Sequence, residues 1–512
     1  LLEAHSLTTL RLRPFLAFRS VNSCTHENGM VNKHYDIVDN GIKTCMYDGY
    51  PELYMQLSKK NEYIYEPNWY KGIEYSKERE LGYEFTEDLY VPGYFEFNIK
   101  KGESVVFSAG VKNLPTRNMK KLFDEEYEVH VARDSFQTCL VNAAHQFHNE
   151  NGGENYILAG YPWFKCRARD TFISLPGLTL ATNESDYFEK VMCTAEKAIN
   201  DLIEGRPISV KMYEMDQPDV LLWAIWAIQQ YSIFKSFDET VVKYGALVDR
   251  IVDYIKQGKH SNLFLHENGL LYANGRDKAI TWMNSEIMGK PVVPRSGYIV
   301  EFNALWYNAL VFNAHLLSKA GHEDQAIEYT KLAEVTASSF KEVFLNQHGY
   351  LLDYVDDGYI SWSVRPNMLI ATSLEYSPLT IQERKKVFDI CTKELRTPKG
   401  IRSLSPKSGG YNPIYEGGQI ERDAAYHQGT VWPWLSGFYL ETCLKIYKQS
   451  GLSFVDRHFV GLEEEMNYHC IGTLPELFDG NPPFHGRGAL SFAMNVAEVL
   501  RVNKLLSKYD NY

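Results

Sequence analysis

The chain has 512 residues, of which 45% are hydrophobic and 23% charged; this excludes a largely disordered protein and allows two or more domains with a large buried core. Its net charge of −12 argues against nucleic acid or an anionic membrane surface as a partner. The eight cysteines are scattered, with none in C-x-x-C or at zinc spacing with histidine, so we expect no metal ion and a reducing, cytoplasmic location.

Residues 1–112 alternate apolar and polar positions, as in "TTLRLRPFLAFRSV" and "GYFEFNIKKGESVVFSAG". The segment "YPELYMQLSKKNEYIYEP" reads as a hairpin, and several short strands without convincing helices predict part of an antiparallel β-sandwich. The chain begins LLEAHS, without Met and in what reads as the middle of a strand, so we expect the natural N-terminus to lie upstream. Residues 113–132 are charged and read as a partly helical linker.

From residue 133 to residue 512 the apolar positions recur with the helical period of about 3.6, which predicts an α-helical domain. No apolar run reaches the roughly 18 residues that a membrane-spanning helix needs. The predicted helices cover 133–148, 169–182, 185–203, 217–236, 238–257, 301–321, 323–344, 365–375, 380–395, 428–448, 453–469 and 487–508.

Charged and uncharged helices alternate along this domain. The odd-numbered helices are amphipathic, as in "TIQERKKVFDICTKEL", whereas the even-numbered ones are nearly free of charge, as in "LLWAIWAIQQY" and "NALWYNALVFN". A helix that is apolar all round is buried, and one with a charged stripe is an outer helix. Six inner and six outer helices predict an (α/α)6 barrel. An α-solenoid also alternates helices, but the chain lacks the fixed sequence period of solenoids.

A polar and aromatic motif stands before, or at the start of, each inner helix. Because the inner helices of such a barrel run parallel, we expect these motifs to converge on one mouth and to form a pocket there. In chain order the motifs are "WFKCRARD", "EMDQPD", "RSGYIVE", "WSVRPN", "ERDAAYHQG" and "TLPELFDGNPPFHGRG".

The residue types at this mouth suit glycoside hydrolysis. The chain has no H-E-x-x-H, P-loop, G-x-S-x-G or helix-opening G-x-G-x-x-G, so we expect no cofactor. Carboxylates in an aromatic pocket are what a glycosidase requires, because one must protonate the leaving oxygen while the other activates water or attacks.

Two carboxylates stand out as a catalytic pair. Asp219 follows Pro218 at a predicted helix start, with Trp223 one turn later. Asp219 could equally be a carboxylate that the helix dipole stabilises in its charged form. A role as the acid therefore requires that burial by Trp223 or repulsion by Asp216 offset the effect of the dipole.

The other member is Glu476, which lies between leucines in "TLPELFDG", where an acid is costly unless it has a function. Asp479 is its rival, with turn formation before Gly480 as the alternative role.

Further residues of the motifs could bind sugar hydroxyls or stack on sugar rings, although each alone fits packing or capping as well. Asp170 follows a cation that favours its ionised state, so it suits hydroxyl binding better than proton transfer. The other candidates are Trp163, Trp223, Arg295, Glu301, Arg365, His427, Gln428, Trp432 and Trp434.

Several motifs in order closely resemble a known family. They are "GYPWF…RDTFISLPGL", "VEFNALWYNAL", "RPNMLIATSLEYSPL", "YEGGQIERDAAYHQGTVWPWLSGFYLE" and "GTLPELFDGNPP…RGALSFAMNVAEVLR". Together they resemble the amylo-α-1,6-glucosidase part of glycogen debranching enzymes, in its stand-alone bacterial form, from about residue 155 to residue 503. Residues 1–112 look like the tail of the β-rich domain that precedes the barrel in this family.

The resemblance implies an inverting hydrolase that removes single α-1,6-linked glucosyl stubs from a branched α-glucan such as glycogen. The family's acid falls on Asp219 and its base on Glu476, while its Arg-Asp pair falls on Arg169 and Asp170, which would hold the terminal glucose. Nothing in the chain resembles the glucanotransferase domain of the two-activity eukaryotic enzymes.

The chain also departs from the family pattern. Arg167-Ala168 stands where the family has Trp-Gly, Asp216 where it has Asn, and Asn284 where relatives have Asp. These changes leave two alternatives open. One is another (α/α)6 glycosidase of glucoamylase or trehalase type, and the other is a glucan-binding protein with impaired catalysis.

Overall fold

The computed structural model describes residues 7–510. The chain separates into two compact units, one ending at Val131 and the other beginning at Ala132. The opening LLEAHS, read above as mid-strand, lies outside the described residues. Across residues 7–510, every helix is too short or too polar to cross a lipid bilayer.

The first unit contains two antiparallel sheets. One has the order β1–β6–β5 and the other the order β2–β3–β4–β7. Ile42 and Met55 from one sheet and Tyr90 and Phe95 from the other are buried in one shared core, which makes this unit a β-sandwich. The elements are β1 (Thr8–Leu12), β2 (Tyr35–Val38), β3 (Gly41–Thr44), β4 (Leu53–Leu57), β5 (Glu62–Glu74), α1 (Ser76–Glu80), β6 (Thr86–Ile99), β7 (Phe107–Gly110), η1 (Thr116–Asn118) and α2 (Met119–Val129).

The hairpin predicted over 50–67 is wrong. Strand β4 pairs with β3 and β7, whereas β5 pairs with β6 in the other sheet. The chain crosses between the sheets at Ser58–Asn61, where the backbone N–H of Ser58 donates to Val106 and the Asn61 amide donates to the Asn40 carbonyl. Alternation in the sequence shows which face of a strand is buried, but the pairing partner depends on the whole sandwich.

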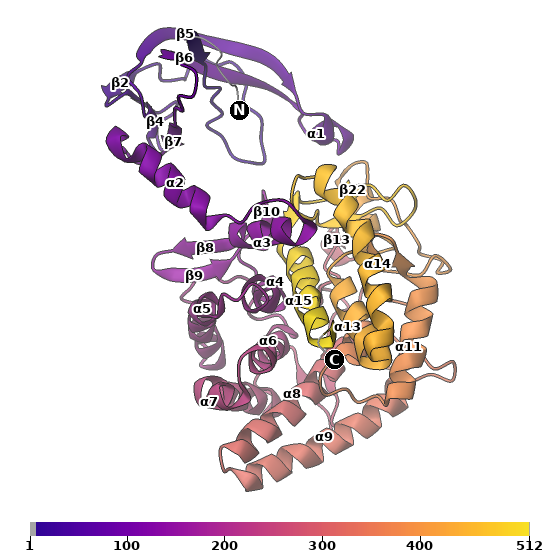
Figure 1. Ribbon diagram of the computed structural model, residues 1–512. Helices are drawn as coiled ribbons and strands as arrows, with labels where there is room; N and C mark the ends of the chain where they lie inside the picture. The colour runs from indigo at the N-terminus through magenta and orange to yellow at the C-terminus, as the bar shows by residue number, and fades with distance from the viewer. Residues whose placement is uncertain (1–6, 511–512) are drawn as a thin grey trace. The chain divides into compact units, whose positions relative to one another are not determined.

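The second unit alternates outer and inner helices (Figure 1). The outer helices described are α3 (Phe136–Gln146), α5 (Ser185–Ile203), α7 (Phe237–Lys256), α9 (Glu323–Phe344), α11 (Ile381–Glu394) and α14 (Leu452–Glu463, continued by η4, Glu464–Asn467). The inner helices described are α4 (Ala168–Leu175, continued by η2, Pro176–Leu180), α6 (Val220–Phe234), α8 (Val300–Lys319), α10 (Met368–Ser373), α13 (Leu435–Tyr447, followed by η3, Lys448–Gly451) and α15 (Ala493–Asp510).

The inner helices form a closed ring. Each packs on the next in the order α4, α6, α8, α10, α13 and α15, and α15 packs back on α4 and η2. The outer helices pack against this ring, for example α9 on α8 and α11 on α10. The predicted (α/α)6 barrel is therefore confirmed, and an open solenoid is excluded by the contact between the first and last inner helices.

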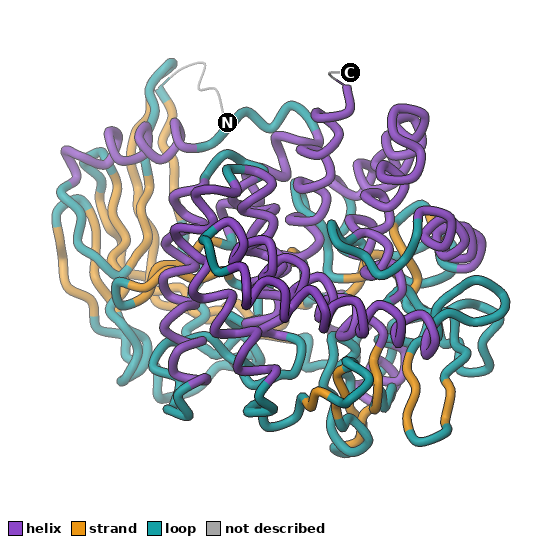
Figure 2. The backbone as a smooth tube through the Cα atoms, turned by 90° about the horizontal axis from the view of Figure 1, so that it is seen from below, coloured by secondary structure: helices purple, strands orange, loops and turns teal. Residues whose placement is uncertain are grey.

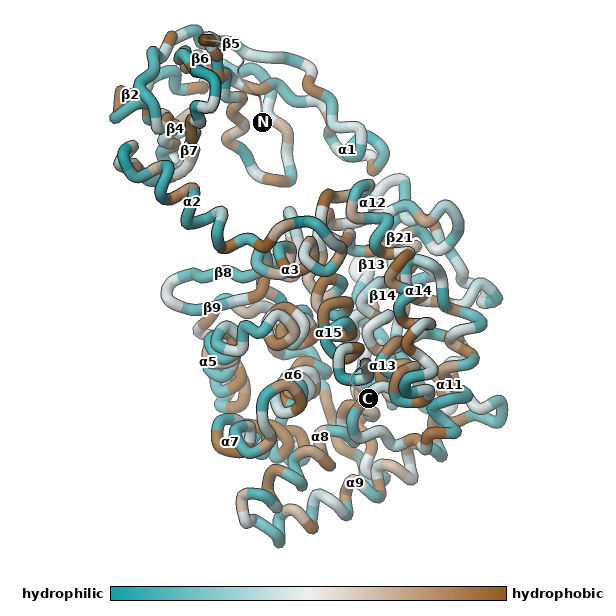
Figure 3. Tube along the Cα trace, viewed as in Figure 1, coloured by the Kyte–Doolittle hydropathy of each residue, from teal (hydrophilic) through white to brown (hydrophobic). Residues whose placement is uncertain are grey.

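Burial follows the charge pattern of the sequence. Residues Val220–Tyr231 of α6 are all buried, whereas α7 buries only the face that carries residues such as Leu247 and Ile251. Figure 3 shows the same contrast, with hydrophilic and hydrophobic residues alternating along α7 and α9. Two predicted inner helices begin late: α13 starts at Leu435, after Pro433, and α15 at Ala493, because short strands occupy the preceding residues.

Short strands lie in the segments that lead into the inner helices, and most of them gather along one side of the helical unit in Figure 2. Two antiparallel sheets of five strands, β11–β12–β15–β16–β17 and β18–β19–β20–β21–β22, tie these segments together. The strands are β8 (His148–Asn151), β9 (Glu154–Ile157), β10 (Gly160–Tyr161), β11 (Phe264–Leu265), β12 (Leu271–Ala273), β13 (Glu286–Ile287), β14 (Lys290–Pro291), β15 (Gly297–Ile299), β16 (Tyr354–Asp356), β17 (Tyr359–Ile360), β18 (Arg396–Thr397), β19 (Gly400–Arg402), β20 (Val431–Trp432), β21 (Leu477–Phe478), β22 (Gly486–Arg487) and β23 (Ser491–Phe492); α12 (Gln419–Ala425) lies among them.

Candidate active site

The segments that lead into α4 and α6 run side by side. Arg167 and Tyr213 form a parallel bridge, in which the backbone N–H of Tyr213 donates to Cys166 at 2.9 Å and that of Ala168 donates to Tyr213 at 2.9 Å. This pairing places the first residues of α4 beside Asp219, the residue that precedes α6.

Asp219 is held by a buried guanidinium. Arg169 donates to its two carboxylate oxygens at 2.7 and 2.8 Å, and the Trp223 indole N–H donates to Oδ2 at 3.1 Å. Asp219 is 2% exposed and Arg169 4%. A bidentate pair of this kind fixes the position of both side chains. Arg169, expected to hold glucose, therefore also holds Asp219, and Trp223 contacts Asp219 from the core.

Glu476 lies immediately before β21 in a buried position. Its Oε2 accepts from the Ala489 N–H at 2.8 Å, and its Oε1 accepts from the Tyr426 hydroxyl. Gly488 is required beside it, because a Cβ there would lie 2.3 Å from Oε2. Burial raises the pKa of Glu476 to about 8, and the nearby Arg167 opposes this rise.

Asp170 follows Arg169, the residue that holds Asp219. The segment before it pairs with the segment that contacts Glu476: Tyr161 of β10 faces Ser491 of β23, and the backbone N–H of Glu476 donates to Ala489 at 3.0 Å. Burial raises the pKa of Asp170 itself, while Arg167 and Arg169 act in the opposite direction. The structure thus gathers Asp170, Asp219 and Glu476 around the start of α4. The separation of about 6.5–9.5 Å expected between the carboxyl groups of an inverting pair stays a prediction.

A second ionic network surrounds the start of α8. Arg295 donates to both oxygens of Glu301 and, at 2.9 and 3.0 Å, to those of Asp353. All three side chains are at most 2% exposed. Since both oxygens of Glu301 are occupied, a sugar hydroxyl would have to compete with Arg295 for them, and the expected substrate contact of Glu301 stays a prediction.

Arg365 links this network to the segment before α13. It donates to the backbone carbonyl of His427 at 2.8 Å and to the amide oxygen of Gln428 at 2.7 Å. Its Nε lies 3.8 Å from Asp353. His427 is fully buried, and this burial, together with Arg365, holds the pKa of its imidazole well below the usual value. His427 is therefore neutral, with Nε2 free of any hydrogen-bond partner.

Aromatic rings surround these groups. Trp282 packs edge-on against His427, Trp432 and Trp434, with ring centroids 5.1–5.4 Å apart, and His427 stacks on Trp432. Trp432 and Trp434 are at most 2% exposed, whereas Trp163 is 40% exposed. Of the tryptophans expected to stack on sugar, only Trp163 presents a largely open ring in the structure.

Sequence reasoning missed three residues of the site. Tyr426 donates to Glu476, Asp353 pairs with Arg295, and Asn367 donates to Asp353 at 2.7 Å while accepting from Trp282. Tyr426 and Asn367 stand inside motifs already identified, "ERDAAYHQG" and "WSVRPN", so their positions were marked. Asp353 lies outside every motif, and no local signal identifies it.

Asp479 has a structural role. Arg487 donates to its Oδ2 at 2.9 and 3.0 Å, and the backbone N–H of Tyr415 donates to Oδ1 at 2.9 Å. We expect Asp479→Asn to destabilise the fold by about 1–3 kcal/mol, because it leaves Arg487 with only the exposed Glu416, at 3.6 Å, as a charge partner within residues 7–510. We also expect it to preserve turnover in the folded fraction. Chemical denaturation and active-site-normalised kinetics test both expectations, and a selective loss of turnover would return Asp479 to the catalytic candidates.

No three His, Cys, Asp or Glu side chains within residues 7–510 are grouped so that they could hold a metal ion. The pair His145 and His148 instead contacts Glu184, and His148 stacks on Tyr187 with the ring centroids 3.9 Å apart.

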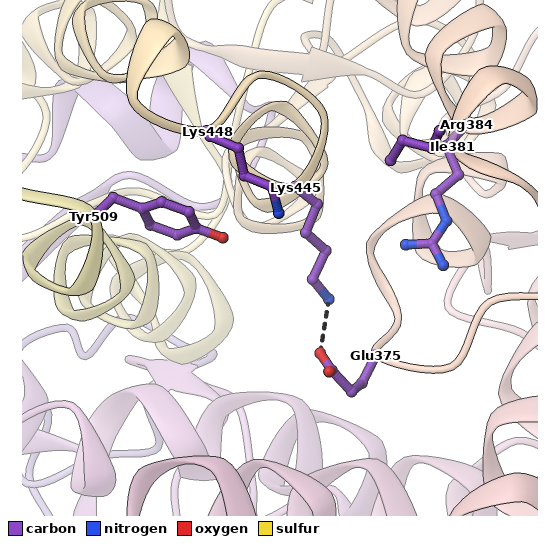
Figure 4. Close-up of a pocket in the computed structure, with 6 residues that line it drawn as sticks. All are labelled: Glu375, Ile381, Arg384, Lys445, Lys448 and Tyr509. Carbon is purple, nitrogen blue, oxygen red and sulfur yellow. Dashed lines mark ion pairs between the residues drawn. The ribbon is translucent and has the colours of Figure 1, made fainter. Parts of the chain in front are cut away.

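A cavity of about 350 Å³ lies where α13 and α15 end (Figure 4). Lys445 forms an ion pair with Glu375 across it at 3.3 Å. The cavity contains none of the predicted site residues; its lining is Glu375, Ile381, Arg384, Lys445, Lys448 and Tyr509.

Comparison with known proteins identifies the family. Residues 137–501 match the family model described as amylo-alpha-1,6-glucosidase, and residues 1–106 match the one described as glycogen debranching enzyme N terminal. The glycogen debranching enzyme of Saccharomyces cerevisiae is 23% identical over 386 residues, which cover 56% of this chain and 25% of the yeast enzyme.

A crystal structure of a bacterial glucoamylase complexed with acarbose is 12% identical, with a TM-score of 0.49, over 92% of this chain and 73% of that chain. The matched region spans only a quarter of the yeast enzyme. The family model, however, covers nearly the whole helical unit, and the buried carboxylates gather at one end of its barrel. The chain therefore belongs to the amylo-α-1,6-glucosidase family of glycoside hydrolases.

Proposed function

We propose that this chain is an inverting, exo-acting glycoside hydrolase that removes single α-1,6-linked glucosyl stubs from a branched α-glucan. The observation that carries this proposal is that two buried carboxylates are tied to the segment that leads into α4. Arg169 holds Asp219, and the pairing of β10 with β23 brings in the segment whose Ala489 N–H donates to Glu476. A neutral, polyhydroxylated substrate also suits a chain with a net charge of −12.

In the proposed reaction, Asp219 protonates the glycosidic oxygen and Glu476 deprotonates the water that attacks the opposite face of the sugar. The observed contacts of both carboxylates have to change for this reaction. Asp219 accepts two hydrogen bonds from Arg169, and the raised pKa of Glu476 keeps it protonated at neutral pH.

We propose that glucose binding brings about this change. Sugar hydroxyls that accept from Arg169 would draw the guanidinium away from Asp219 and leave its carboxyl oxygens free to meet the glycosidic oxygen. Water and hydroxyls admitted beside Glu476 would relieve the burial that opposes its ionisation.

The raised pKa of Glu476 and the cation beside Asp219 favour the opposite assignment, with Glu476 as acid and Asp219 as base. The same two carboxylates carry the reaction in either case. α-Glucosyl fluoride separates the two assignments, because fluoride leaves without a proton, so only the variant that lacks the acid should still hydrolyse it.

The pH profile should respond to Arg167. Its positive charge lowers the pKa of Glu476, so Arg167→Ala should raise that pKa further. If Glu476 is the base, the ascending limb of kcat/KM moves to higher pH. We expect a displacement of less than about one pH unit, because Arg167 is a third exposed and water screens its charge.

The matched control is Arg206→Ala, which removes a cation from the same unit where it pairs with Asp201 and Glu204. Its pH profile should stay in place. A displacement to lower pH in Arg167→Ala would contradict a lowering of the pKa of Glu476 by the charge of Arg167.

Proton NMR of the sugar released from a glucan that carries single α-1,6-glucosyl stubs tests the function itself. Release of β-glucose is the expected result, because inversion at an α-linkage gives the β-anomer. Release of α-glucose would show a retaining mechanism and contradict the proposal. Binding of the glucan without release of any sugar would instead show a glucan-binding protein.

A further inference from the structure

A cavity of about 230 Å³ opens beside the segment that leads into α4. It lies in the barrel unit, between the β8–β9 hairpin and the two paired segments before α4 and α6. Its size lies below the roughly 300–1,000 Å³ of typical small-molecule sites, which suits one sugar ring better than a long chain. The lining residues are Asn149, Asn151, Tyr156, Leu158, Phe164, Lys165, Cys166, Lys211 and Tyr213.

Part of the lining of this cavity belongs to the two segments that also carry residues of the candidate active site. Cys166 and Tyr213 line it and are joined by the backbone hydrogen bond between these two segments. A few residues farther along the same segments stand Arg169 and Asp219, which form the buried ion pair. Three residues extend over at most about 11 Å, so the cavity lies within a short length of chain from the catalytic groups.

The lining offers neutral hydrogen-bonding groups and no carboxylate. The side-chain amide of Asn149 has only the sulfur of Cys166 as a partner for its Nδ2, at 4.0 Å, so it can turn to a hydroxyl at little cost. Lys211 already donates to Asn151 at 3.1 Å, and Lys165 lies over the ring of Tyr213 at 5.1 Å.

Tyr213 is 44% exposed and provides an aromatic ring at the edge of the cavity. Such a ring has an apolar face and a polar hydroxyl, the combination that suits the mixed surface of a sugar. Trp163, 40% exposed, precedes the lining residue Phe164 in the chain. Amide and ammonium donors beside exposed rings suit the hydroxyl groups and apolar faces of a sugar. The two lysines are partnered by neutral groups, the Asn151 amide and the Tyr213 ring, so the preference for a neutral ligand over an anion rests on the proposed substrate.

We propose that this cavity binds a glucosyl unit of the glucan chain that carries the scissile stub, away from the bond that is cut. The inference rests on the proposed function. Its physical benefit is that binding energy from a remote part of a substrate can hold the reacting bond in place. In this arrangement a glucosyl-α-1,6-glucose disaccharide, which has a single glucose unit beyond the bond that is cut, would not reach the cavity, whereas a branched glucan would.

The test compares kcat/KM on these two substrates for Asn149→Ala and Tyr213→Ala. We expect each variant to lose about tenfold on the branched glucan, mainly through KM, which corresponds to about 1.4 kcal/mol. Hydrolysis of the disaccharide should change less than twofold. Tyr213→Phe keeps the ring and should retain most of the activity on the glucan. Tyr468→Ala, which removes a tyrosine that is 80% exposed elsewhere in this unit, is the matched control.

An equal loss on both substrates would overturn the proposal, because it would show a structural effect on the neighbouring catalytic segments. Unchanged activity on both would overturn it as well. If the wild type hydrolyses neither substrate, the proposed function fails and the cavity is judged separately by calorimetric binding of maltotriose. Binding that is lost in Asn149→Ala and Tyr213→Ala would then support the cavity as a sugar site, and binding that is equal in all three proteins, or absent from the wild type, would refute it.

Discussion

Glu476→Gln should lose about 10²–10⁴-fold in kcat on an α-1,6-linked substrate, the range that a positioned acid or base contributes. The amide keeps the shape of the carboxyl group: its oxygen can still accept from the Ala489 N–H, and its NH2 group can donate to the Tyr426 hydroxyl, but it can neither take nor give the proton. The fold should not suffer, because the protonated carboxyl that Gln replaces is itself neutral.

The same substitution should change the dependence of stability on pH. The pKa of Glu476 is raised from 4.5 to about 8 in the folded protein. The unfolded chain therefore releases this proton first, and the stability that the buried carboxyl supports below pH 4.5 is lost between about pH 4.5 and 8. Glu476→Gln lacks this loss, so its free energy of unfolding should exceed that of the wild type most clearly at pH 8.

Urea denaturation of both proteins at pH 5 and pH 8 measures this difference. An advantage of Glu476→Gln that is equal at the two pH values would show that Glu476 titrates normally. Full retention of kcat in a correctly folded Glu476→Gln would remove Glu476 from the catalytic pair.

Asp219→Asn should damage both activity and stability. Its kcat on α-1,6-linked substrates should fall by about 10²–10⁴-fold if Asp219 donates or accepts the proton. It should also lower the free energy of unfolding by about 3–5 kcal/mol, because it leaves the buried guanidinium of Arg169 without its anion. Glu476→Gln should show no such loss, so denaturation distinguishes the two environments independently of kinetics.

A double variant gives the control for Asp219→Asn. Arg169→Met combined with Asp219→Asn removes the unpaired guanidinium and should recover part of the lost stability without recovering activity. If Asp219→Asn is as stable as the wild type, the ion pair does not have the role that its geometry indicates. The fluoride test is separate from stability: hydrolysis of α-glucosyl fluoride by Asp219→Asn, but not by Glu476→Gln, would identify Asp219 as the acid.

The barrel could be read from the sequence because its signal is local and repeated. An inner helix such as α6 is buried on every side and therefore carries no charge from Val220 to Tyr231, whereas its outer neighbours need a charged face. The pairing of strands in the first unit was not readable in this way. The two strands of the supposed hairpin alternate as paired strands do, yet they belong to different sheets.

The residues of the candidate site also differ in whether a local sequence pattern identifies them. Asp219 and Glu476 stand out in the sequence because each breaks a local pattern, a carboxylate at a helix start in one case and an acid between leucines in the other. The partners of these carboxylates lie far away in the sequence. Arg169 is 50 residues from Asp219, and Tyr426 is 50 residues from Glu476. Such partners are set by the closure of the barrel and leave no trace in local composition.

The packing of α15 on α4 has a consequence for the synthesis of the chain. The apolar faces of the first inner helix emerge from the ribosome more than 300 residues before the helix that covers them. At about 5–20 residues per second, roughly 15 to 60 seconds pass before the barrel can close. During that time the nascent unit exposes a hydrophobic seam, so its yield in a cell should depend on chaperones that cover this seam, and a premature stop before Ala493 should give an aggregating product rather than a shorter enzyme.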